Sequence, residues 1–358
     1  MPVTRPIDLH RRLPGYAPTS LVRLEGAIEG IAAPIVVKLE TSRYGLPSFK
    51  VLGASWAVGC RIAGWLGPHA PDDRSYDAIR PALDAHGTRP TLVAATDGNH
   101  GRAVAWSARQ LGCAAEVFVP AGTAQSRRQA IVAEGAALTV VEGDYDETVA
   151  AAAARATGDR LLVQDTALEG GETGVEDVVA GYATVFDELA EQLSGGSTGP
   201  CILVVPVGVG SLALAAARFI RERRAGDHLV TVEPTEAASL QRSLVEGRLV
   251  AIPGPHVSCM VGLRCGSISA GAWPELRAAT DLAMAIEDAD ADEAMRWLAQ
   301  RGVVVGECGA ATLAAARRAV PEGLLQPLLA NGDATLVLIA TEAPTDPERW
   351  RAVVGRDP

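Results

Sequence analysis

Short apolar runs alternate with Ala-rich amphipathic segments from about residue 35 to the end of the chain. The runs are rich in Val, Ile and Leu and show little internal alternation, which is typical of strands buried on both faces of a parallel sheet. The expected strands are Ile35–Lys38, Thr91–Ala95, Ala115–Pro120, Leu138–Glu142, Leu161–Asp165, Cys201–Val207, Leu229–Glu233 and Thr335–Thr341. The expected helices include Gly101–Leu111, Ala124–Glu134, Glu147–Ala156, Asp177–Gln192 and Leu212–Arg224. A helix after most strands predicts an α/β protein.

This many βα units exceed what one sheet comfortably holds, so we expect two lobes with a cleft between them. Each lobe is expected to be a three-layer α/β/α unit with a mostly parallel, twisted sheet. The expected domains are a large one from residues 1–71 and 161–358 and a small mobile one from residues 72–160. Pro71–Arg74 and Gly195–Pro200 are rich in Gly, Ser, Pro and Asp and are predicted to be connectors.

Composition excludes several classes of function. The chain carries 32 basic and 43 acidic residues, a net charge of -11, so we expect no nucleic-acid partner and no anionic membrane surface. Its apolar runs are too short to span a membrane, and its polar N-terminus lacks the core of a secretion signal, so the expected location is the cytoplasm. The six cysteines show no metal-binding spacing, and we expect buried thiols and no metal.

The chain contains only two lysines, Lys38 and Lys50, beside 30 arginines. A sequence that uses Arg wherever a cation serves retains Lys for tasks that Arg cannot perform. A lysine amine can lose its proton and form a Schiff base, whereas a guanidinium stays protonated. Pro47 and Ser48 are helix-start signals, so Lys50 is expected in the first turn of a helix that runs through Cys60. The helix dipole opposes a cation there, which favours an amine that must become neutral.

Three further strand ends carry candidate site residues. After the strand Thr91–Ala95, residues 96–102 read Thr-Asp-Gly-Asn-His-Gly-Arg, a tight loop whose N–H groups suit a substrate carboxylate. In that loop, the carboxylate of Asp97 would be a negative charge without a function unless it transfers protons or binds a substrate ammonium. The loop Gly208-Val209-Gly210-Ser211 before a helix predicts a phosphate cradle. With Ala213 it is also a weak dinucleotide fingerprint, with Glu233 ending the next strand. The last strand ends in the hydroxyl of Thr341.

Taken in order, Ser48-x-Lys50, the loop 98–101 and the loop 208–211 resemble the fold-type II pyridoxal-phosphate enzymes. The chain resembles the diaminopropionate ammonia-lyases within that superfamily more closely. The similar stretches are Leu13–Thr19, Tyr44-Gly45-Leu46, Ala95–Arg102, Asp144–Val149, Val163–Ala167, Gly208–Ser211 and Gly262-Leu263-x-Cys265-Gly266. Asp97 is the residue that best distinguishes the diaminopropionate ammonia-lyases from the wider superfamily, which usually carries a hydroxyl at that position.

The resemblance implies a role for each residue. Lys50 would hold pyridoxal phosphate as a Schiff base and act as a base for the α-proton. Asn99 would bond the phenolic oxygen of the cofactor, Thr341 would face its pyridine nitrogen, and the phosphate would bind to residues Gly208, Val209, Gly210, Ser211 and Leu212. Asp97 and Asp165 would be acid/base groups, and their pKa values could be raised by burial toward neutrality. The substrate would contact Thr96, Asp97, Gly98, His100 and Arg264.

Two loops depart from the family pattern. After Cys265-Gly266 the family has an acidic residue and a proline, where this chain has Ser267 and Ile268, and Arg264 is introduced just before. Ala343-Pro344 replaces an expected glycine after Glu342. One hypothesis is that Arg264 recognises an additional carboxylate or phosphate on a larger substrate. Its replacement by Ala should then selectively weaken an acidic substrate.

The favoured interpretation is α,β-elimination of a small β-substituted amino acid, foremost 2,3-diaminopropionate, to pyruvate and ammonia, by a homodimer. A β-replacement synthase or cyclase with the same cofactor is the first alternative, and the altered loops favour it. A nicotinamide-dependent oxidoreductase built on residues 208–213 is a remote alternative that leaves Lys50 and Asn99 unexplained. The third, a non-catalytic ligand-binding protein, gives no reason to retain these residues together with the two aspartates.

Overall fold

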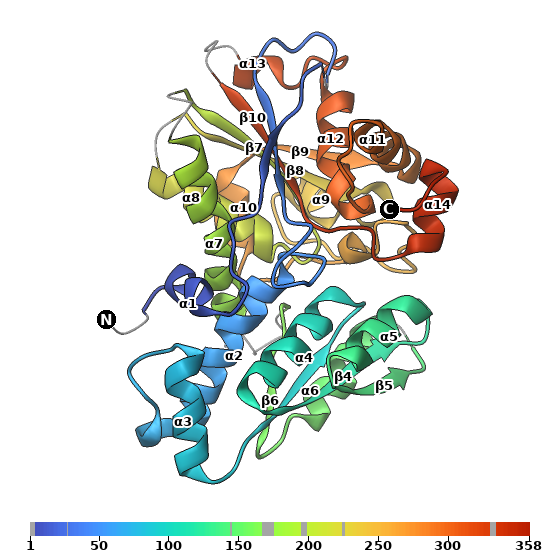
Figure 1. The fold of residues 1–358 in the computed structure, drawn as a ribbon. Helices are drawn as coiled ribbons and strands as arrows, with labels where there is room; N and C mark the ends of the chain where they lie inside the picture. The colour runs from blue at the N-terminus through green and yellow to red at the C-terminus, as the bar shows by residue number, and fades with distance from the viewer. Residues whose placement is uncertain are drawn as a thin grey trace. The chain divides into compact units, whose positions relative to one another are not determined.

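The computed structural model describes residues 4–26, 28–143, 145–166, 175–194, 199–223, 226–329 and 334–358. Asp144, Ala167, part of the expected connector 195–200 and the expected helix end at Arg224 lie outside these residues. The chain forms two compact units (Figure 1). The first comprises Met1–Ala17 and Arg43–Thr184, and the second comprises Pro18–Ser42 and Val185–Pro358. The expected mobile domain at residues 72–160 stays a prediction.

The first unit contains a four-stranded parallel sheet of order β5-β4-β3-β6. Its strands are β3 (Thr91–Ala95), β4 (Ala114–Pro120), β5 (Ala137–Val141) and β6 (Arg160–Leu162). Its helices are α1 (Pro6–Arg12), α2 (Lys50–Leu66), α3 (Tyr76–His86), α4 (Asn99–Leu111), α5 (Gln125–Ala133) and α6 (Tyr145–Arg155), with the 3-10 turn Gly67–His69 after α2. The helix α7 (Val175–Leu193) begins in this unit and ends in the second.

Helices cover both faces of this sheet. Val93, Ala95 and Phe118 pack on the α6 residues Val149 and Ala152. On the other face, α4 approaches so closely that a Cβ at Gly101 would lie 2.6 Å from Cγ1 of Val117. Since successive strand residues point to opposite faces, an unbroken apolar strand such as β3 fits this environment.

The second unit contains a six-stranded sheet of order β1-β2-β10-β7-β8-β9. Its strands are β1 (Leu21–Arg23), β2 (Ile35–Leu39), β7 (Cys201–Pro206), β8 (His228–Pro234), β9 (Thr280–Ile286) and β10 (Thr335–Ala340). Its helices are α8 (Ser211–Arg223), α9 (Ser239–Glu246), α10 (Trp273–Ala279), α11 (Asp288–Gln300), α12 (Glu307–Ala319), α13 (Gln326–Leu329) and α14 (Pro347–Val354), with 3-10 turns at Thr235–Ala237 and Val261–Leu263. All neighbouring strands are parallel except β1, which pairs antiparallel with β2.

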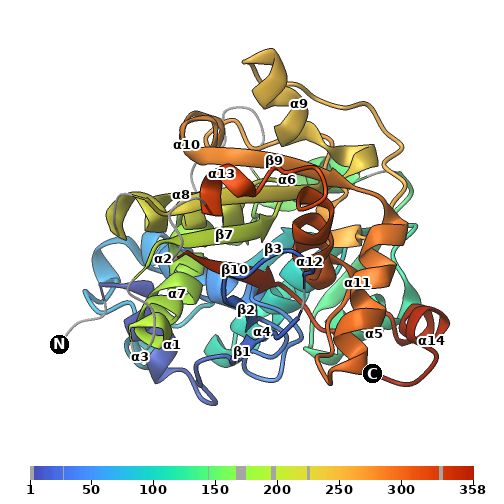
Figure 2. The same ribbon diagram turned by 90° about the horizontal axis from the view of Figure 1, so that it is seen from above.

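The core of the second unit lies mainly between the sheet and the pair α11 and α12. The strand residues that face this pair alternate in the sequence, as in Ile202 and Val204 or Leu336 and Leu338. Figures 1 and 2 show α8 on the opposite side of the sheet from α11 and α12. The expected α/β class and parallel sheets are therefore confirmed, and in the described residues no helix is both long and apolar enough to cross a membrane.

Two expectations about strands were wrong. β1 and β9 were not expected, because β1 has only three residues and β9 begins with Thr280 and Asp281. The expected strand Leu161–Asp165 ends at Leu162. The chain leaves the sheet there, and this departure forms part of the candidate site.

Candidate active site

Lys50 is the first residue of α2, as the start signals predicted, although the helix extends beyond Cys60 to Leu66. The backbone N–H of Lys50 points to Oγ of Ser48 at 3.4 Å. A tight turn precedes the helix, in which Tyr44 has φ 53° and Gly45 has φ 78°, and Arg43 and Leu46 exchange two backbone hydrogen bonds. The similar stretch at residues 44–46 therefore sets the path of the chain into α2.

The Lys50 ammonium forms an ion pair with Asp165. Its Nζ lies 2.7 Å from Oδ2 of Asp165, and its side chain is 22% exposed whereas that of Asp165 is 7% exposed. The rings of Phe49 and Tyr182 lie beside it, with their centroids 5.5 and 5.9 Å from Nζ. Burial raises the pKa of the Tyr182 phenol, so this group stays neutral. The amine therefore lies between an ionised carboxylate and two aromatic rings, and part of its side chain remains accessible.

The expectation that burial raises the pKa of Asp165 toward neutrality was wrong in this state of the molecule. Burial is the largest single influence and disfavours the ionised carboxylate, but the interactions with His100 and Lys50 together outweigh it. The pKa of Asp165 is lowered to about 2. Asp165 is therefore ionised. It can accept a proton, but it does not carry one that it could donate.

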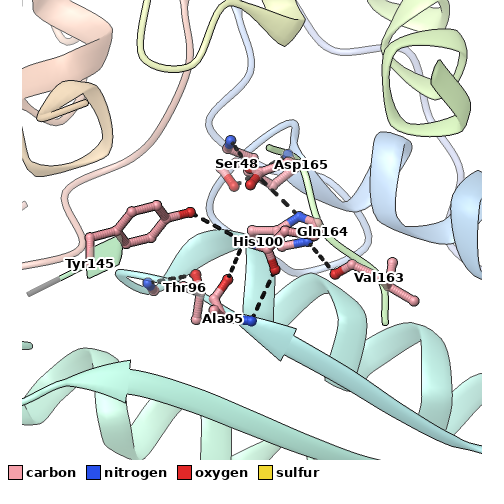
Figure 3. A network of polar contacts seen from close by, with 10 residues as sticks. Ser48, Ala95, Thr96, His100, Tyr145, Val163, Gln164 and Asp165 are labelled. Atoms are coloured by element: carbon pink, nitrogen blue, oxygen red, sulfur yellow. Dashed lines mark hydrogen bonds and ion pairs between the residues drawn. The ribbon is translucent and has the colours of Figure 1, made fainter. Parts of the chain in front are cut away.

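Gln164 explains how Asp165 leaves the sheet without loss of hydrogen bonds (Figure 3). Its Oε1 accepts the N–H of Ala95 at 3.0 Å, and its Nε2 donates to the carbonyl of Ala95 at 3.2 Å and to the Tyr145 hydroxyl at 3.3 Å. The side chain of Gln164 thus replaces the missing strand partner of Ala95, since buried backbone groups need partners. Gln164 was given no role from the sequence, because an amide in this position has no distinctive spacing.

The loop after β3 forms the tight turn that its sequence predicted. Oγ1 of Thr96 accepts the N–H of Gly98 at 2.9 Å, so this N–H is already used within the loop. Gly98 has φ 152°, a conformation that favours glycine. Asn99 begins α4, and Asp97 is half-buried in the turn before it.

His100 is almost fully buried, at 3% exposure, and its ring points away from solvent. Its Nε2 donates to the carbonyl of Val163 at 2.9 Å, and its Nδ1 lies 3.8 Å from Oδ2 of Asp165. The structure therefore brings together Lys50, Asp165 and His100, three of the residues expected from the sequence. His100 contacts Asp165 in this arrangement, whereas the sequence analysis expected it to contact substrate.

In the second unit, the glycine loop joins β7 to the N-terminus of α8, as expected for a phosphate cradle. A Cβ at Gly208 would lie 2.9 Å from the carbonyl oxygen of Gly262 and 3.3 Å from Sγ of Cys265. Gly210 has φ 97°, and a Cβ there would lie 3.0 Å from Leu276. Ser211 and Leu212 form the first turn of α8 and are buried. Only glycine fits at residues 208 and 210, which leaves the backbone of the loop open to a ligand.

Thr341 directly follows β10 and is 5% exposed. Its hydroxyl has no hydrogen-bond partner among the described residues, which is costly for a buried polar atom. A partner from outside the chain, such as a ring nitrogen, would remove that cost. Together with the accessible amine of Lys50 and the glycine loop, this hydroxyl fits the groups of pyridoxal phosphate.

Arg264 lies on the turn that packs on the glycine loop. Its φ and ψ are -75° and 64°, and the N–H of Cys265 donates to the carbonyl of Leu263 at 2.8 Å, so Arg264 is the central residue of an inverse γ-turn. Arg264 is half-buried, and its guanidinium forms no hydrogen bond or ion pair among the described residues. An unpaired guanidinium in this position is consistent with a role in binding an anion.

Glu233 excludes the dinucleotide interpretation of the glycine loop. It is 1% exposed, and its two carboxylate oxygens accept the N–H groups of Leu240 and Gln241, each at 2.8 Å. A dinucleotide site needs an acidic group here for the ribose hydroxyl. Both carboxylate oxygens of Glu233 bind the N-terminus of α9 instead. The oxidoreductase alternative therefore lacks the acidic group that would bind the ribose.

Comparisons with known proteins agree with this site. Residues 12–342 match the family model described as "Pyridoxal-phosphate dependent enzyme". The chain is 33% identical to diaminopropionate ammonia-lyase of Escherichia coli (strain K12) over 97% of its length and 89% of that protein. It superposes with a TM-score of 0.87 on the crystal structure of that Escherichia coli enzyme in complex with D-serine, at 32% identity, with 98% and 90% of the two chains covered.

A second crystal structure of the Escherichia coli enzyme contains an aminoacrylate-PLP azomethine reaction intermediate. It matches with a TM-score of 0.84 and 31% identity, over 98% of this chain and 90% of that one. The matches cover nearly the whole chain, including both units and the segments that carry Lys50, the glycine loop and Thr341. The chain therefore belongs to the fold-type II pyridoxal-phosphate-dependent enzymes and, within them, to the diaminopropionate ammonia-lyase family.

Proposed function

We propose that the protein eliminates the β-amino group of 2,3-diaminopropionate as ammonia, and that hydrolysis of the resulting enamine by water releases pyruvate and a second ammonia. The observation that carries the proposal is the ion pair between Nζ of Lys50 and Oδ2 of Asp165, at 2.7 Å, beside the loop that contains Asp97. A carboxylate in contact with the amine suits a substrate that carries a second ammonium group, and Asp97, on the loop before α4, is the second acidic candidate. The relatives of the same family support the reaction class.

Pyridoxal phosphate, when bound, withdraws electrons from the α-carbon of an amino acid. Lys50 would attach it, Asn99 would bond its phenolic oxygen, Gly208–Ser211 and Leu212 would hold its phosphate, and Thr341 would face its ring nitrogen. Nζ of Lys50 takes the α-proton of one substrate enantiomer, and Asp97 serves the opposite configuration. The hydroxyl hydrogen of Thr96 and the N–H groups of the loop that Thr96 does not accept would hold the substrate carboxylate, with Gly98 shaping the turn.

The ionised state of Asp165 favours an ammonium over a hydroxyl leaving group. A β-ammonium already carries the proton with which it departs as ammonia, whereas a hydroxyl needs a proton from an acid. An ionised carboxylate at Asp165 attracts the former and cannot supply a proton to the latter. Diaminopropionate is therefore expected to react faster than serine.

The proposal extends to location and assembly. We expect a homodimer in the cytoplasm that acts on a small amino acid, with residues 72–160 as a small mobile domain. The relatives support the substrate class, and the dimer is a prediction from the resemblance. Sedimentation of the purified protein at several concentrations measures its oligomeric state.

The deciding experiment is a substrate panel with the pyridoxal-phosphate-loaded protein. L- and D-diaminopropionate, L- and D-serine and a β-substituted amino acid with an extra carboxylate are compared, with pyruvate and ammonia as readouts. The proposal expects two ammonia per pyruvate from diaminopropionate. A protein that takes up the cofactor but releases no pyruvate from diaminopropionate would contradict it.

The unpaired Arg264 keeps β-replacement or cyclisation of an acidic substrate as the second candidate. Its test is to add a nucleophile and to measure whether a substituted amino acid replaces pyruvate as the product. In Arg264→Ala, a loss confined to the acidic substrate supports this second candidate. An equal change on all substrates contradicts it.

A further inference from the structure

Two buried tyrosines contact the helix α2, which begins at Lys50, and their hydroxyl groups differ. The hydroxyl of Tyr76, on α3, donates to the backbone carbonyl of Ser55 at 2.8 Å. Tyr182, on α7, is fully buried, and its hydroxyl forms no hydrogen bond among the described residues. A buried polar group without a partner is costly, and a phenylalanine at residue 182 would avoid that cost. The hydroxyl of Tyr182 therefore needs a functional explanation.

Two glycines bring the ring of Tyr182 against the first turns of α2. A Cβ at Gly53 would lie 2.4 Å from Cε1 and 2.8 Å from Cζ of Tyr182, the ring carbon that carries the hydroxyl. A Cβ at Gly181 would lie 2.4 Å from the carbonyl oxygen of Leu52. Since helix residues three apart share a face, the hydroxyl end of the ring lies on the face of α2 that carries Lys50.

The ring of Tyr182 also lies beside the amine itself, with its centroid 5.9 Å from Nζ of Lys50. Burial is the largest influence on the phenol and raises its pKa, while the charge of Lys50 lowers the pKa and that of Asp165 raises it. The phenol is therefore neutral, and its hydroxyl is within range of the two charges of the site. The Lys50 ammonium donates to Oδ2 of Asp165 at 2.7 Å.

The protonation state of Lys50 decides what this hydroxyl can do. An ammonium has three hydrogens and no lone pair, so the phenol can only accept from it, and the hydroxyl hydrogen finds no acceptor there. A neutral amine has a lone pair and is a strong acceptor, and a phenol is a better donor than acceptor. Of the two states of Lys50, only the neutral amine gives the hydroxyl hydrogen of Tyr182 an acceptor on Nζ.

We propose that Tyr182 is a positioning residue for Lys50: its O–H donates to Nζ when that nitrogen is neutral, and this bond favours the form of the amine that acts as nucleophile and base. The proton that the ammonium gives up goes to solvent, since the Lys50 side chain is 22% exposed. The Tyr182 hydroxyl keeps its own hydrogen throughout. This inference rests on the proposed function in one respect, that the neutral form of Lys50 is the reactive one.

Other titratable and charged groups lie around this amine. Asp165 pairs with it, and Nδ1 of His100 lies 3.8 Å from the same carboxylate oxygen. Asp97 lies in the loop before α4, and the side chain of Arg127, on α5, packs by Gly98 of that loop. A variant that lacks only one hydroxyl retains all of these groups, so their influence is common to it and to the wild type.

Tyr182→Phe removes only the hydroxyl, and Tyr76→Phe is the matched control on the same helix. In the cofactor-free chain, Tyr76→Phe should lower the urea midpoint of unfolding, because it deletes a buried hydrogen bond. Tyr182→Phe should leave the midpoint unchanged or raise it, because its hydroxyl has no bond to lose in that state. A fall in Tyr182→Phe as large as in Tyr76→Phe would show that the hydroxyl has a structural bond, and the proposal would be wrong.

The first test of Lys50 itself is its labelling by acetic anhydride in the cofactor-free chain, followed against pH by mass spectrometry of the peptide that contains it. Only the neutral amine reacts, so the pH of half-maximal labelling reports the pKa of Lys50. Loss of a bond donated to the neutral amine should raise this pH by about one unit in Tyr182→Phe and leave it unchanged in Tyr76→Phe. No shift overturns the proposal, and a shift to lower pH means that the hydroxyl accepts from the ammonium and overturns it as well.

The second test is the rate of pyridoxal-phosphate uptake, followed by visible absorption. Tyr182→Phe should take up the cofactor about 10-fold more slowly than the wild type at neutral pH, equivalent to one pKa unit, and should approach the wild-type rate at high pH. Tyr76→Phe should match the wild type at both. A loss of the same size at every pH would indicate a general distortion of the site and would contradict the proposal.

These results can be told apart from a failure of the proposed function. If Lys50 were not the cofactor lysine, borohydride reduction of the loaded protein would tag another residue, while the labelling of Lys50 would still shift in Tyr182→Phe. If the substrate were not diaminopropionate, the substrate panel would fail while the labelling and the uptake still changed as expected.

Discussion

The two lysines of the chain both form ion pairs with an acidic residue, but their surroundings differ. Lys38 of β2 is fully buried, and its ammonium donates to Oε2 of Glu188 at 2.8 Å, to the carbonyl of Thr19 at 3.0 Å and to Oε1 of Gln192 at 3.0 Å. Three acceptors satisfy all three of its hydrogens. Lys50 is partly exposed, starts a helix and has an ion pair with Asp165.

This difference separates a structural lysine from a reactive one. Loss of the proton from the Lys38 amine would deprive the buried Glu188 of the cation with which it pairs, which is costly in the interior. The Lys50 amine is less enclosed, because part of its side chain is accessible. Both lysines were expected to perform tasks unsuited to Arg, and the two tasks differ: Lys38 is structural and Lys50 is reactive. At Lys38 three acceptors surround a compact ammonium, which a planar guanidinium would fit poorly.

Replacement of the reactive lysine should have the largest effect. Lys50→Ala should abolish the visible band with pyridoxal phosphate and lower activity by on the order of 10³-fold or more. The thermal unfolding temperature of the variant should fall to some extent, because the buried Asp165 loses the cation with which it pairs, so activity is compared on folded protein. A coloured Lys50→Ala protein would show that the cofactor is attached elsewhere, and Lys38 is the other lysine of the chain.

Replacement of the structural lysine should act on stability. Lys38→Met removes the ammonium that pairs with the buried Glu188 and should cost about 3–5 kcal/mol in the free energy of unfolding, measured by urea denaturation. The matched double variant Lys38→Met with Glu188→Leu should recover most of this loss. Folded protein of either variant should still take up the cofactor on Lys50. Equal stability of Lys38→Met and the wild type would contradict the structural assignment.

A substitution beside Lys50 tests how closely its helix must be packed. A Cβ at Gly181 of α7 would lie 2.4 Å from the carbonyl oxygen of Leu52 in α2. Gly181→Ala should therefore push the two helices apart and cost about 1–3 kcal/mol in unfolding free energy. Cofactor uptake should slow, because Tyr182 lines the amine. Unchanged stability and uptake would mean that the contact relaxes freely.

The smallest expected effect is the pH dependence contributed by Asp165. The pKa of its carboxyl is about 2 in the folded chain against an ordinary value of 3.8. The folded pKa is the lower one, so the ionised carboxylate stabilises the fold above pH 3.8, and this contribution is lost as the pH falls toward 2. The difference in unfolding free energy between wild type and Asp165→Asn, at most about 2 kcal/mol, should shrink over that range. A constant difference would show that Asp165 has its ordinary pKa in the fold.

Much of the architecture was predictable because strand and helix periods are local properties of the sequence. The strand Thr91–Ala95 was predicted with its observed bounds, and Pro47 and Ser48 predicted that Lys50 lies in the first turn of a helix, which α2 confirms. The short strand β1 was missed, because three residues do not display a period. The strand before Asp165 was predicted too long, since nothing local shows that the side chain of Gln164 replaces the backbone in pairing with Ala95.

The sequence by itself determined which residue types are present at the ends of strands: an amine at residue 50, acids at 97 and 165, glycines at 208 and 210, and a hydroxyl at 341. These follow from chemistry and from short-range turn preferences. Only the tertiary structure decided that Glu188 neutralises Lys38, that His100 shares an oxygen with Lys50, and that Asp165 is ionised rather than protonated. The reason is that the charge of a buried group depends on partners distant in the chain, and their distances are set by packing.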